Sequence, residues 1–216
     1  IIDYKDFCYK KQTQLIPEVK QKLLSKDETK DLKLVLDIVK DYEKNGAGSI
    51  SVLTDHQFFD GSLNFLRFIK QNTKIPIIQK DFIISEYQIF QAFINGADGI
   101  VLIAEALDYF QLKDYYNLAK ELGLEVFIEN HTIDALEKIN KINPDFIVVS
   151  SRNLKTMKVN IEFFEKVQSL IPEKSIIIAE GGIKSNKEYK YIKNLKYNGA
   201  FIGANLMLKE NPGNFL

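Results

Sequence analysis

The strongest constraint on the fold is a regular alternation of short apolar runs with longer segments of helical periodicity. Each run has four or five residues, is rich in β-branched side chains and has the length of a buried strand. The eight runs are Leu15–Val19, Ser49–Leu53, Ile75–Ile78, Gly99–Ile103, Leu124–Ile128, Asp145–Val149, Ser175–Ala179 and Ala200–Gly203. Because strands alternate with helices, we expect parallel strands joined by right-handed crossovers.

The segments between the runs have the marks of amphipathic helices. Helical spacing of apolar residues is found in Leu32–Lys44, Tyr87–Phe93 and Tyr109–Leu122. Asp108 and Thr132 mark helix starts, and Ser185 with Glu188 three residues later is typical of a capping box. The pattern predicts seven intervening helices and a short tail.

Eight strand–helix units of roughly 25 residues each fit a (β/α)8 TIM barrel. No linker rich in Pro, Gly or Ser divides the 216 residues, so we expect one domain over residues 1–216, with 1–13 as a short N-terminal extension. The competing fold is a doubly wound open sheet. It more often carries a G-x-G-x-x-G turn after its first strand, which this sequence lacks.

The charge balance limits the classes of partner. Lys and Arg total 29, as do Asp and Glu, so the formal net charge is zero. Nucleic-acid binding usually needs a basic face, and anionic lipid attracts polybasic segments, so we expect neither partner. No apolar run approaches the ~20 residues of a membrane span. The single cysteine, Cys8, permits no intrachain disulfide, which fits a cytoplasmic location.

In a barrel of this kind, chemistry takes place where the strands end at their C-terminal side. Glu18 and Lys20 lie two residues apart on the first strand and therefore share one face. If they point inward, they meet Lys80, Glu129 and the strand-seven glutamate at the barrel mouth. Several carboxylates with two lysines form a plausible acid–base constellation. The alternative is a purely structural network of ion pairs.

The ends of strands seven and eight favour a phosphate site. Gly181-Gly182 and Gly203-Ala204 let backbone N–H groups approach a ligand, and barrels often hold phosphate at this place. Arg152 has the geometry for a bidentate contact with phosphate or carboxylate. The alternative is that these glycines only serve ordinary turns.

Other candidates are weaker. His56 and His131 lie near turns, where a lone histidine is usually solvated. Phe59 has the chemistry to stack on an aromatic substrate. No spacing of His, Cys, Asp or Glu resembles a metal site, so we expect no metal.

Several ordered motifs resemble one family over nearly the whole chain from about Leu15. The strongest segment is SVLTDHQFFDGS at 51–62, and the others are KDFIISEYQIFQAFI at 80–94, GLEVFIENH, SSRNLKT, AEGGIKS and GAFIGANLM. Together they are similar to the indole-3-glycerol phosphate synthase family of the tryptophan pathway. The resemblance implies a TIM barrel that acts on 1-(2-carboxyphenylamino)-1-deoxyribulose 5-phosphate. The implied reaction is ring closure with loss of carbon dioxide and water, without metal or organic cofactor. We expect a cytoplasmic monomer whose partner is this phosphorylated small molecule.

The resemblance also implies residue roles. Lys80 matches the general acid, and Glu129 matches the carboxylate that stabilises and deprotonates the ring-closed intermediate. Glu18 and Lys20 match the strand-one pair, in which the lysine lies near the substrate carboxylate and takes part in proton transfer. The remaining matches are Arg152, Ser150, Glu180, Phe59 and Phe82 for substrate binding, and Gly181, Gly182, Gly203 and Ala204 for phosphate binding.

Four positions depart from the family pattern. Leu23-Leu24-Ser25 stands where the family has S-P-S, and Ser150 stands where it has Asn. Gly181 and Ala204 each stand where the family has Ser. These changes leave two alternatives open. One is a barrel that acts on another sugar phosphate, for example as an isomerase, and the other is a catalytically degraded barrel kept as an interaction partner.

Overall fold

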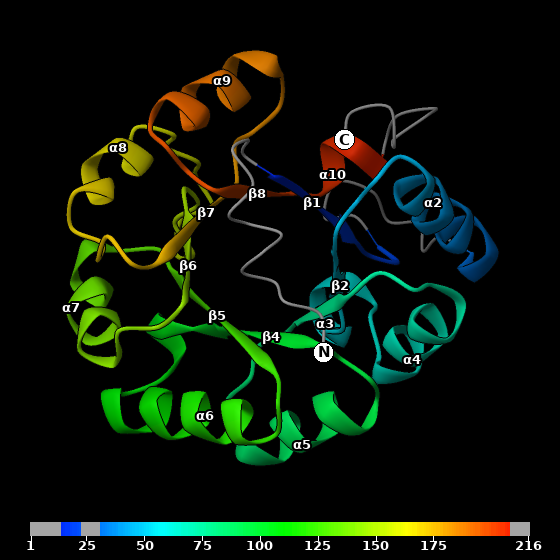
Figure 1. Cartoon of the computed structure of the whole chain (residues 1–216). Helices are drawn as coiled ribbons and strands as arrows, with labels where there is room; N and C mark the ends of the chain where they lie inside the picture. Colours follow the sequence, from blue (N-terminus) through cyan, green and yellow to red (C-terminus); the bar gives the residue numbers. More distant parts are fainter. Residues whose placement is uncertain (1–13, 23–30, 208–216) are drawn as a thin grey trace.

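The computed structural model describes residues 14–22 and 31–207 and contains a closed barrel of eight parallel strands (Figure 1). The strands are β1 (Gln14–Val19), β2 (Ile50–Leu53), β3 (Ile77–Lys80), β4 (Gly99–Ile103), β5 (Glu125–Asn130), β6 (Phe146–Ser150), β7 (Ile176–Glu180) and β8 (Gly199–Ile202). Pairing of β1 with β8, for example Gln14 with Gly199, closes the barrel. This confirms the predicted fold and excludes the open sheet. The expected extension at 1–13 and the departure at Leu23 lie outside the described residues.

Helices join each strand to the next and surround the barrel (Figure 1). They are α2 (Leu32–Lys44), α3 (His56–Phe59), α4 (Leu63–Asn72), α5 (Glu86–Ile94), the 3-10 helix η1 (Ala104–Ala106), α6 (Tyr109–Glu121), α7 (Ile133–Ile142), α8 (Phe163–Gln168), α9 (Asn186–Asn194) and α10 (Ala204–Met207). The predicted helix starts are confirmed: Asp108, Thr132 and Ser185 are N-caps whose side chains accept a backbone N–H. Ser185 forms the expected capping box with Glu188.

Several strands extend further toward their C-terminal ends than the sequence pattern indicated. β3 continues through Lys80, β5 through Asn130 and β7 through Glu180, each beyond the last residue of the predicted apolar run. The sequence pattern placed the end of each of these strands at its last apolar residue. In the structure the three strands continue into the polar residues at the mouth.

The barrel interior holds its own apolar core, separate from the core between strands and helices. Its members are Ile16, Ile78, Val101, Phe127, Phe146, Val148, Ile176, Ile178 and Phe201. The Phe127 ring packs 4.7 Å from Phe146 and 6.2 Å from Phe201, between ring centroids. A Cβ on Gly99 would lie 3.2 Å from the Phe127 ring, so glycine there makes room for it.

Two-residue periodicity places the site directly above this core. Side chains two apart on a strand point to the same face. Above Ile78 the next inward residue is Lys80, and above Phe127 it is Glu129. The same step places Glu18 above Ile16. On β1, β3 and β5 the barrel interior therefore changes from an apolar to a charged side chain over two residues.

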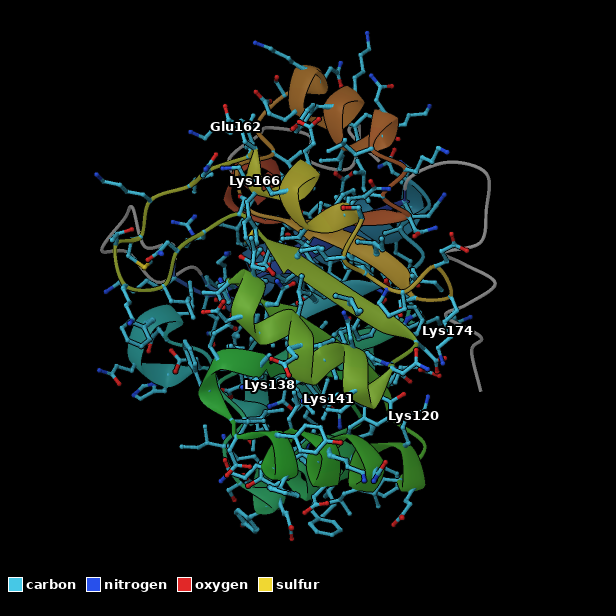
Figure 2. The ribbon with its side chains drawn as sticks, turned by 90° about the vertical axis from the view of Figure 1, so that its left-hand side faces the viewer. Lys120, Lys138, Lys141, Glu162, Lys166 and Lys174 are labelled. Carbon is cyan, nitrogen blue, oxygen red and sulfur yellow. The ribbon has the colours of Figure 1, made fainter. Side chains whose placement is uncertain are left out.

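The outer face formed by α6, α7 and α8 carries several lysines (Figure 2). Lys120 pairs with Glu125 at 2.9 Å and with Asp145 at 3.6 Å, and Lys141 pairs with Glu137 at 2.8 Å. Lys138 donates to the Leu107 carbonyl at 2.6 Å. The charges of Lys120 and Lys141 are therefore neutralised locally. None of the helices that the structure describes has the length and apolar character needed to span a bilayer.

Candidate active site

A cavity of about 720 Å³ opens at the C-terminal mouth of the barrel. Its lining includes all but one of the predicted site residues: Glu18, Lys20, Phe59, Lys80, Phe82, Glu129, Ser150, Arg152, Glu180, Gly181, Gly182 and Gly203. The remaining one, Ala204, is the first residue of α10, and its side chain lies outside the described part of the chain. Residues up to 185 positions apart in sequence thus meet around one opening, as parallel strands require.

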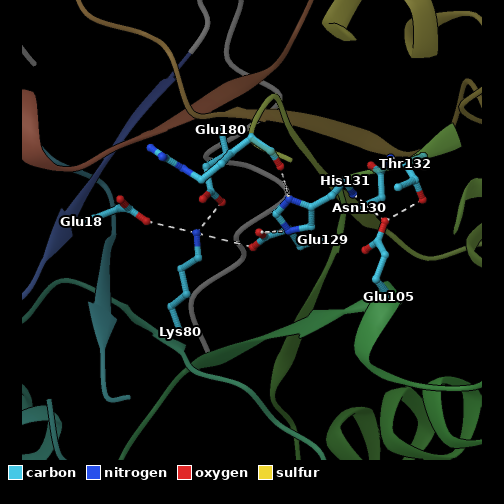
Figure 3. A network of polar contacts seen from close by, with 9 residues as sticks. Glu18, Lys80, Glu105, Glu129, Asn130, His131, Thr132 and Glu180 are labelled. Atoms are coloured by element: carbon cyan, nitrogen blue, oxygen red, sulfur yellow. Dashed lines mark hydrogen bonds and ion pairs between the residues drawn. The ribbon is translucent and has the colours of Figure 1, made fainter. Parts of the chain in front are cut away.

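Lys80 is the centre of the charged cluster (Figure 3). Its Nζ lies 3.1 Å from Glu18 Oε1 and 3.4 Å from Glu129 Oε2, and it also forms an ion pair with Glu180 Oε2. The three carboxylates come from β1, β5 and β7, so each reaches Lys80 from a different side of the barrel. The Phe201 ring lies beneath the ammonium, with its centroid 5.3 Å from Nζ. One buried ammonium therefore joins three strands.

The cluster sets the protonation states of its members. Burial alone would lower the pKa of Lys80, but Glu129, Glu18 and Glu180 outweigh it and raise that pKa well above its usual value. Burial alone would raise the pKa of Glu18, yet the charges of Lys80 and Lys20 lower it to about 2. At neutral pH the cluster thus holds a charged lysine and an ionised Glu18.

The other two carboxyl groups differ from each other. Burial opposes ionisation of Glu129, but Lys80 and His131 lower its pKa. Burial and the nearby charge of Glu129 raise the pKa of Glu180 to about 7, although Lys80 acts in the opposite direction. Two carboxyl groups whose pKa values are pushed apart provide one permanent base and one group that can carry a proton near neutral pH.

Lys20, which follows the last residue of β1, forms a second, smaller cluster. Its Nζ lies 3.4 Å from Glu18 Oε2 and 5.2 Å from the centroid of the Phe59 ring. A Cβ on Gly203 would collide with Glu18 Oε2 and would lie 2.9 Å from Lys20 Nζ. Glycine at 203 therefore leaves room for the ends of these two side chains, which a Cβ would displace, a reason that the sequence did not reveal.

The Gly181-Gly182 turn packs closely against the loop between β6 and α8. Both residues have positive φ, 81° and 73°, which glycine adopts without strain. A Cβ on Gly181 would lie 2.9 Å from Ser151 Oγ, and one on Gly182 would lie 2.7 Å from Val159 Cγ1. At Gly181, where the family pattern has Ser, a side chain would need both the unusual backbone conformation and displacement of Ser151.

Sequence reasoning missed the apolar wall of the cavity. Leu154, Met157 and Val159 lie in the β6–α8 loop (residues 151–162) and line the opening although each is at least 39% exposed. Phe58 also lines it and packs against Phe82 with ring centroids 6.0 Å apart. The available signal was three large apolar side chains within a loop, where burial in a core does not account for them.

The expectation that His131 is solvated was wrong. The side chain is 4% exposed, and Nε2 lies 2.8 Å from Glu129 Oε1. Nδ1 lies 2.7 Å from the Arg152 carbonyl oxygen. The sequence placed His131 near a turn but gave no sign that the turn is covered by the β6–α8 loop. His56 is as expected, with a side chain 87% exposed.

Arg152 lies at the mouth, and its guanidinium contacts its own loop. Nη1 donates to the Met157 carbonyl at 3.3 Å, and the backbone of Arg152 forms an isolated antiparallel bridge with Val159. The side chain is only partly buried and lines the cavity. It is therefore available at the opening, while its carbonyl is engaged by His131. Among residues 14–22 and 31–207, no group of three or more His, Cys, Asp or Glu side chains is arranged to hold a metal ion.

The structure is a TIM barrel whose mouth holds a cluster of lysine and carboxylate side chains. Sequence comparison is more specific. The sequence model of the family described as indole-3-glycerol phosphate synthase matches residues 4–216. The chain belongs to this family, whose members are carboxy-lyases of tryptophan biosynthesis. The family and the activity class implied by the sequence motifs are thereby confirmed.

Curated relatives carry the same name. The indole-3-glycerol phosphate synthase of Campylobacter jejuni subsp. doylei is 39% identical over 206 residues, which are 95% of this chain and 80% of the relative. That of Legionella pneumophila (strain Lens) is 37% identical over 94% of this chain and 78% of its own length. The N-acetylmannosamine-6-phosphate 2-epimerase of Clostridium perfringens has a similar structure, with a TM-score of 0.69 over 89% of this chain and 86% of its own. At 18% identity that likeness concerns the fold alone.

Proposed function

We propose that this chain closes the indole ring of indole-3-glycerol phosphate, with Lys80 and Glu129 as its central catalytic residues. The substrate is 1-(2-carboxyphenylamino)-1-deoxyribulose 5-phosphate, and carbon dioxide and water are released. One observation carries the proposal: Lys80 Nζ lies within 3.4 Å of Glu129 at the floor of a cavity large enough for a drug-sized ligand.

Lys80 acts as the general acid. Ring closure turns the ketose carbonyl oxygen into a hydroxyl, so the oxygen needs a proton as the carbon–carbon bond forms. The surrounding carboxylates raise the pKa of Lys80, which keeps the ammonium protonated at neutral pH. The same positive charge stabilises the negative charge that develops on the oxygen before the proton arrives.

Glu129 acts on the ring-closed intermediate. Its lowered pKa keeps it ionised at neutral pH, as stabilisation of a cationic ring and removal of a proton both require. It is 2% exposed, so bulk water hardly screens its charge. Glu129 therefore stabilises the cationic ring until carbon dioxide leaves and then removes a ring proton in the dehydration, while a lysine ammonium protonates the hydroxyl that leaves as water.

Lys20 and Glu180 are the remaining groups that we propose to transfer protons in the site. Lys20 attracts the substrate carboxylate and takes part in proton transfer, while Glu18 holds both lysines in place through contacts of 3.4 Å and 3.1 Å. Glu180, with a pKa of about 7, can return a proton to Lys80 after the lysine has given one to the substrate. A carboxyl group that titrates near neutral pH suits such transfer.

Binding at the two ends of the substrate orients the reacting carbons between them. We infer that the phosphate is held by backbone N–H groups of Gly181, Gly182, Gly203 and Ala204, with Ser150 and Arg152 beside it. The anthranilate ring lies against Phe59 and Phe82 and meets the apolar wall of the β6–α8 loop. Binding energy from these remote groups positions the carbonyl carbon for attack.

We also infer that the enzyme works as a monomer in the cytoplasm and binds neither nucleic acid nor membrane. The formal net charge of zero and the locally paired Lys120 and Lys141 support this view. Light scattering of the purified chain at micromolar concentration tests it. A mass of one chain, 24.9 kDa, is expected, and twice that mass would contradict the monomer.

The reaction itself is tested by steady-state turnover. The purified chain is mixed with the carboxyphenylamino substrate, and the indole product is followed by its fluorescence. Saturable formation of indole-3-glycerol phosphate is expected. Absence of turnover at saturating substrate, with a folded protein, would contradict the proposal, and preferential turnover of another phosphosugar would favour the alternative of a different sugar phosphate.

A further inference from the structure

His131 contacts both Glu129 of β5 and the backbone of Arg152 at the start of the β6–α8 loop (Figure 3). It follows Asn130, the last residue of β5, and its ring is buried between Glu129 and the start of the β6–α8 loop. One ring nitrogen faces a Glu129 carboxylate oxygen at 2.8 Å, and the other faces the Arg152 carbonyl oxygen at 2.7 Å.

Both neighbours of the ring are hydrogen-bond acceptors. A neutral imidazole has one N–H and one lone pair, so one of the two contacts would set a lone pair against an oxygen atom. A proton on each nitrogen removes that repulsion. The contact with Glu129 is an ion pair at 2.8 Å without hydrogen-bond geometry, and together with the Arg152 contact it favours the imidazolium form of His131.

The charges around the ring agree with this form. Glu129 faces it from β5, and Glu105 of η1 accepts the His131 backbone N–H at 2.7 Å. The positive groups nearby are Lys80, on the far side of Glu129, and the guanidinium of Arg152, which is turned toward Met157. Burial alone would lower the pKa of His131, but Glu129 outweighs it and raises that pKa.

We propose that His131 is a positioning residue, which fixes the Glu129 carboxylate and anchors the β6–α8 loop through the Arg152 carbonyl. The part of this proposal that concerns turnover rests on the proposed role of Glu129. The anchoring part does not, because it concerns only the contacts of the ring.

Two consequences follow from a bridge of this kind. One Glu129 oxygen faces His131 and the other lies 3.4 Å from Lys80, so loss of the ring frees the carboxylate to rotate. Loss of the ring also releases the carbonyl of Arg152, at the start of the loop that carries Leu154, Met157 and Val159. The first change lowers kcat, and the second raises KM because the apolar wall is less well placed.

The protonation state is tested first, on the unmodified protein. The chain has two histidines, and His56 is exposed, so long-range ¹H–¹⁵N NMR of the imidazoles gives two sets of signals. The His56→Gln variant assigns them. We expect both His131 nitrogens to carry protons at pH 7. A neutral ring with one protonated nitrogen at pH 7 would overturn the proposal, and this measurement needs no activity.

The positioning role is then tested by kinetics of His131→Gln, whose single NH2 group cannot replace donors on two separate ring nitrogens. We expect kcat to fall about 10- to 100-fold and KM to rise. The range for kcat is the one found when a side chain that orients a metal ligand is removed from other enzymes. We expect kcat of the wild type to fall at alkaline pH as His131 loses its proton, and we expect the His131→Gln variant to lack this part of the fall while it keeps any part that comes from Glu180. His56→Gln should match the wild type in every respect.

Unchanged kcat and KM in His131→Gln, or an unchanged alkaline limb, would overturn the positioning role. If this variant does not fold, His131→Asn takes its place under the same criteria, and the NMR result decides if neither folds. A wild-type chain that carries the doubly protonated His131 but makes no product would contradict the proposed function while supporting the bridge.

Discussion

The two halves of the barrel interior are built from the same strands but serve different purposes. On β5, Phe127 and Glu129 point to the same face two residues apart, yet one packs among aromatic rings and the other faces an ammonium. The lower layer is the apolar core of the barrel interior, which includes Phe127. It stabilises the fold because it buries apolar surface. The upper layer places four buried or half-buried ionisable groups together, namely Glu18, Lys80, Glu129 and Glu180, which costs desolvation but provides groups that can exchange protons. The residue that stabilises the fold and the residue proposed for activity thus lie only two positions apart on the same strand.

The largest effect is expected at the centre of the upper layer. Lys80→Met should lower kcat about 10²- to 10⁴-fold, because the general acid is lost. The three carboxylates then lack their common partner and take up protons instead. Steady-state formation of the indole product measures the loss. The control is Lys166→Met on the outer face (Figure 2), which should leave kcat unchanged. A Lys80→Met enzyme within twofold of wild type would show that the lysine is structural.

The lower layer should respond in stability rather than chemistry. Phe127→Ala removes a fully buried ring and should reduce the free energy of unfolding by about 3–5 kcal/mol. Urea denaturation measures this, and kcat of the folded fraction should stay within a few-fold of wild type. Phe110→Ala, where the ring is 73% exposed, is the matched control and should change neither quantity. A large loss of kcat without loss of stability would break the separation of layers.

The upper layer should also make stability depend on pH through Glu180. Its pKa is raised to about 7 in the folded protein, so the neutral form is favoured there. This contribution is fully present below about pH 4.5 and is lost as the pH rises through 7. Between these limits the wild type should lose up to about 3 kcal/mol relative to Glu180→Gln. Urea denaturation of both proteins at pH 5 and 7.5 measures the change, and a constant difference would contradict the raised pKa.

The smallest effect is expected away from both layers. Asp108 caps α6 in a capping box with Gln111. Asp108→Ala should reduce the free energy of unfolding by about 1 kcal/mol and leave kcat and KM unchanged. Thermal denaturation and the indole assay measure the two quantities. A fall in kcat or a rise in KM in this variant would contradict the view that residues outside the barrel interior affect stability alone.

The sequence predicted the barrel well because local signals dominate its construction. Apolar runs and N-caps such as Ser185 are set by neighbouring residues, and parallel strands then bring Lys80 and Glu129 to the same opening. The spacing of two predicted that Glu18 and Lys20 share one face, and the structure shows that both line the cavity. The strand ends were less well predicted, since a polar side chain at the mouth looks like a loop residue in the sequence.

What the sequence could not give were contacts between distant segments. The burial of His131 depends on the β6–α8 loop that covers it, and the need for glycine at 203 depends on Glu18 and Lys20 across the β1–β8 seam. The sequence likewise did not show that Met157 and Val159 form an apolar wall of the cavity, because this depends on where their loop lies in the fold. Such features arise from tertiary packing, which a local pattern does not contain.

A crystal structure with indole-3-glycerol phosphate bound tests the central claim most directly. The account predicts the phosphate against the backbone of Gly181, Gly182 and Gly203, the indole ring against Phe59 and Phe82, and Lys80 Nζ and Glu129 facing the carbons where the ring closed. A ligand bound with its phosphate on Lys80, or outside the mouth altogether, would contradict it.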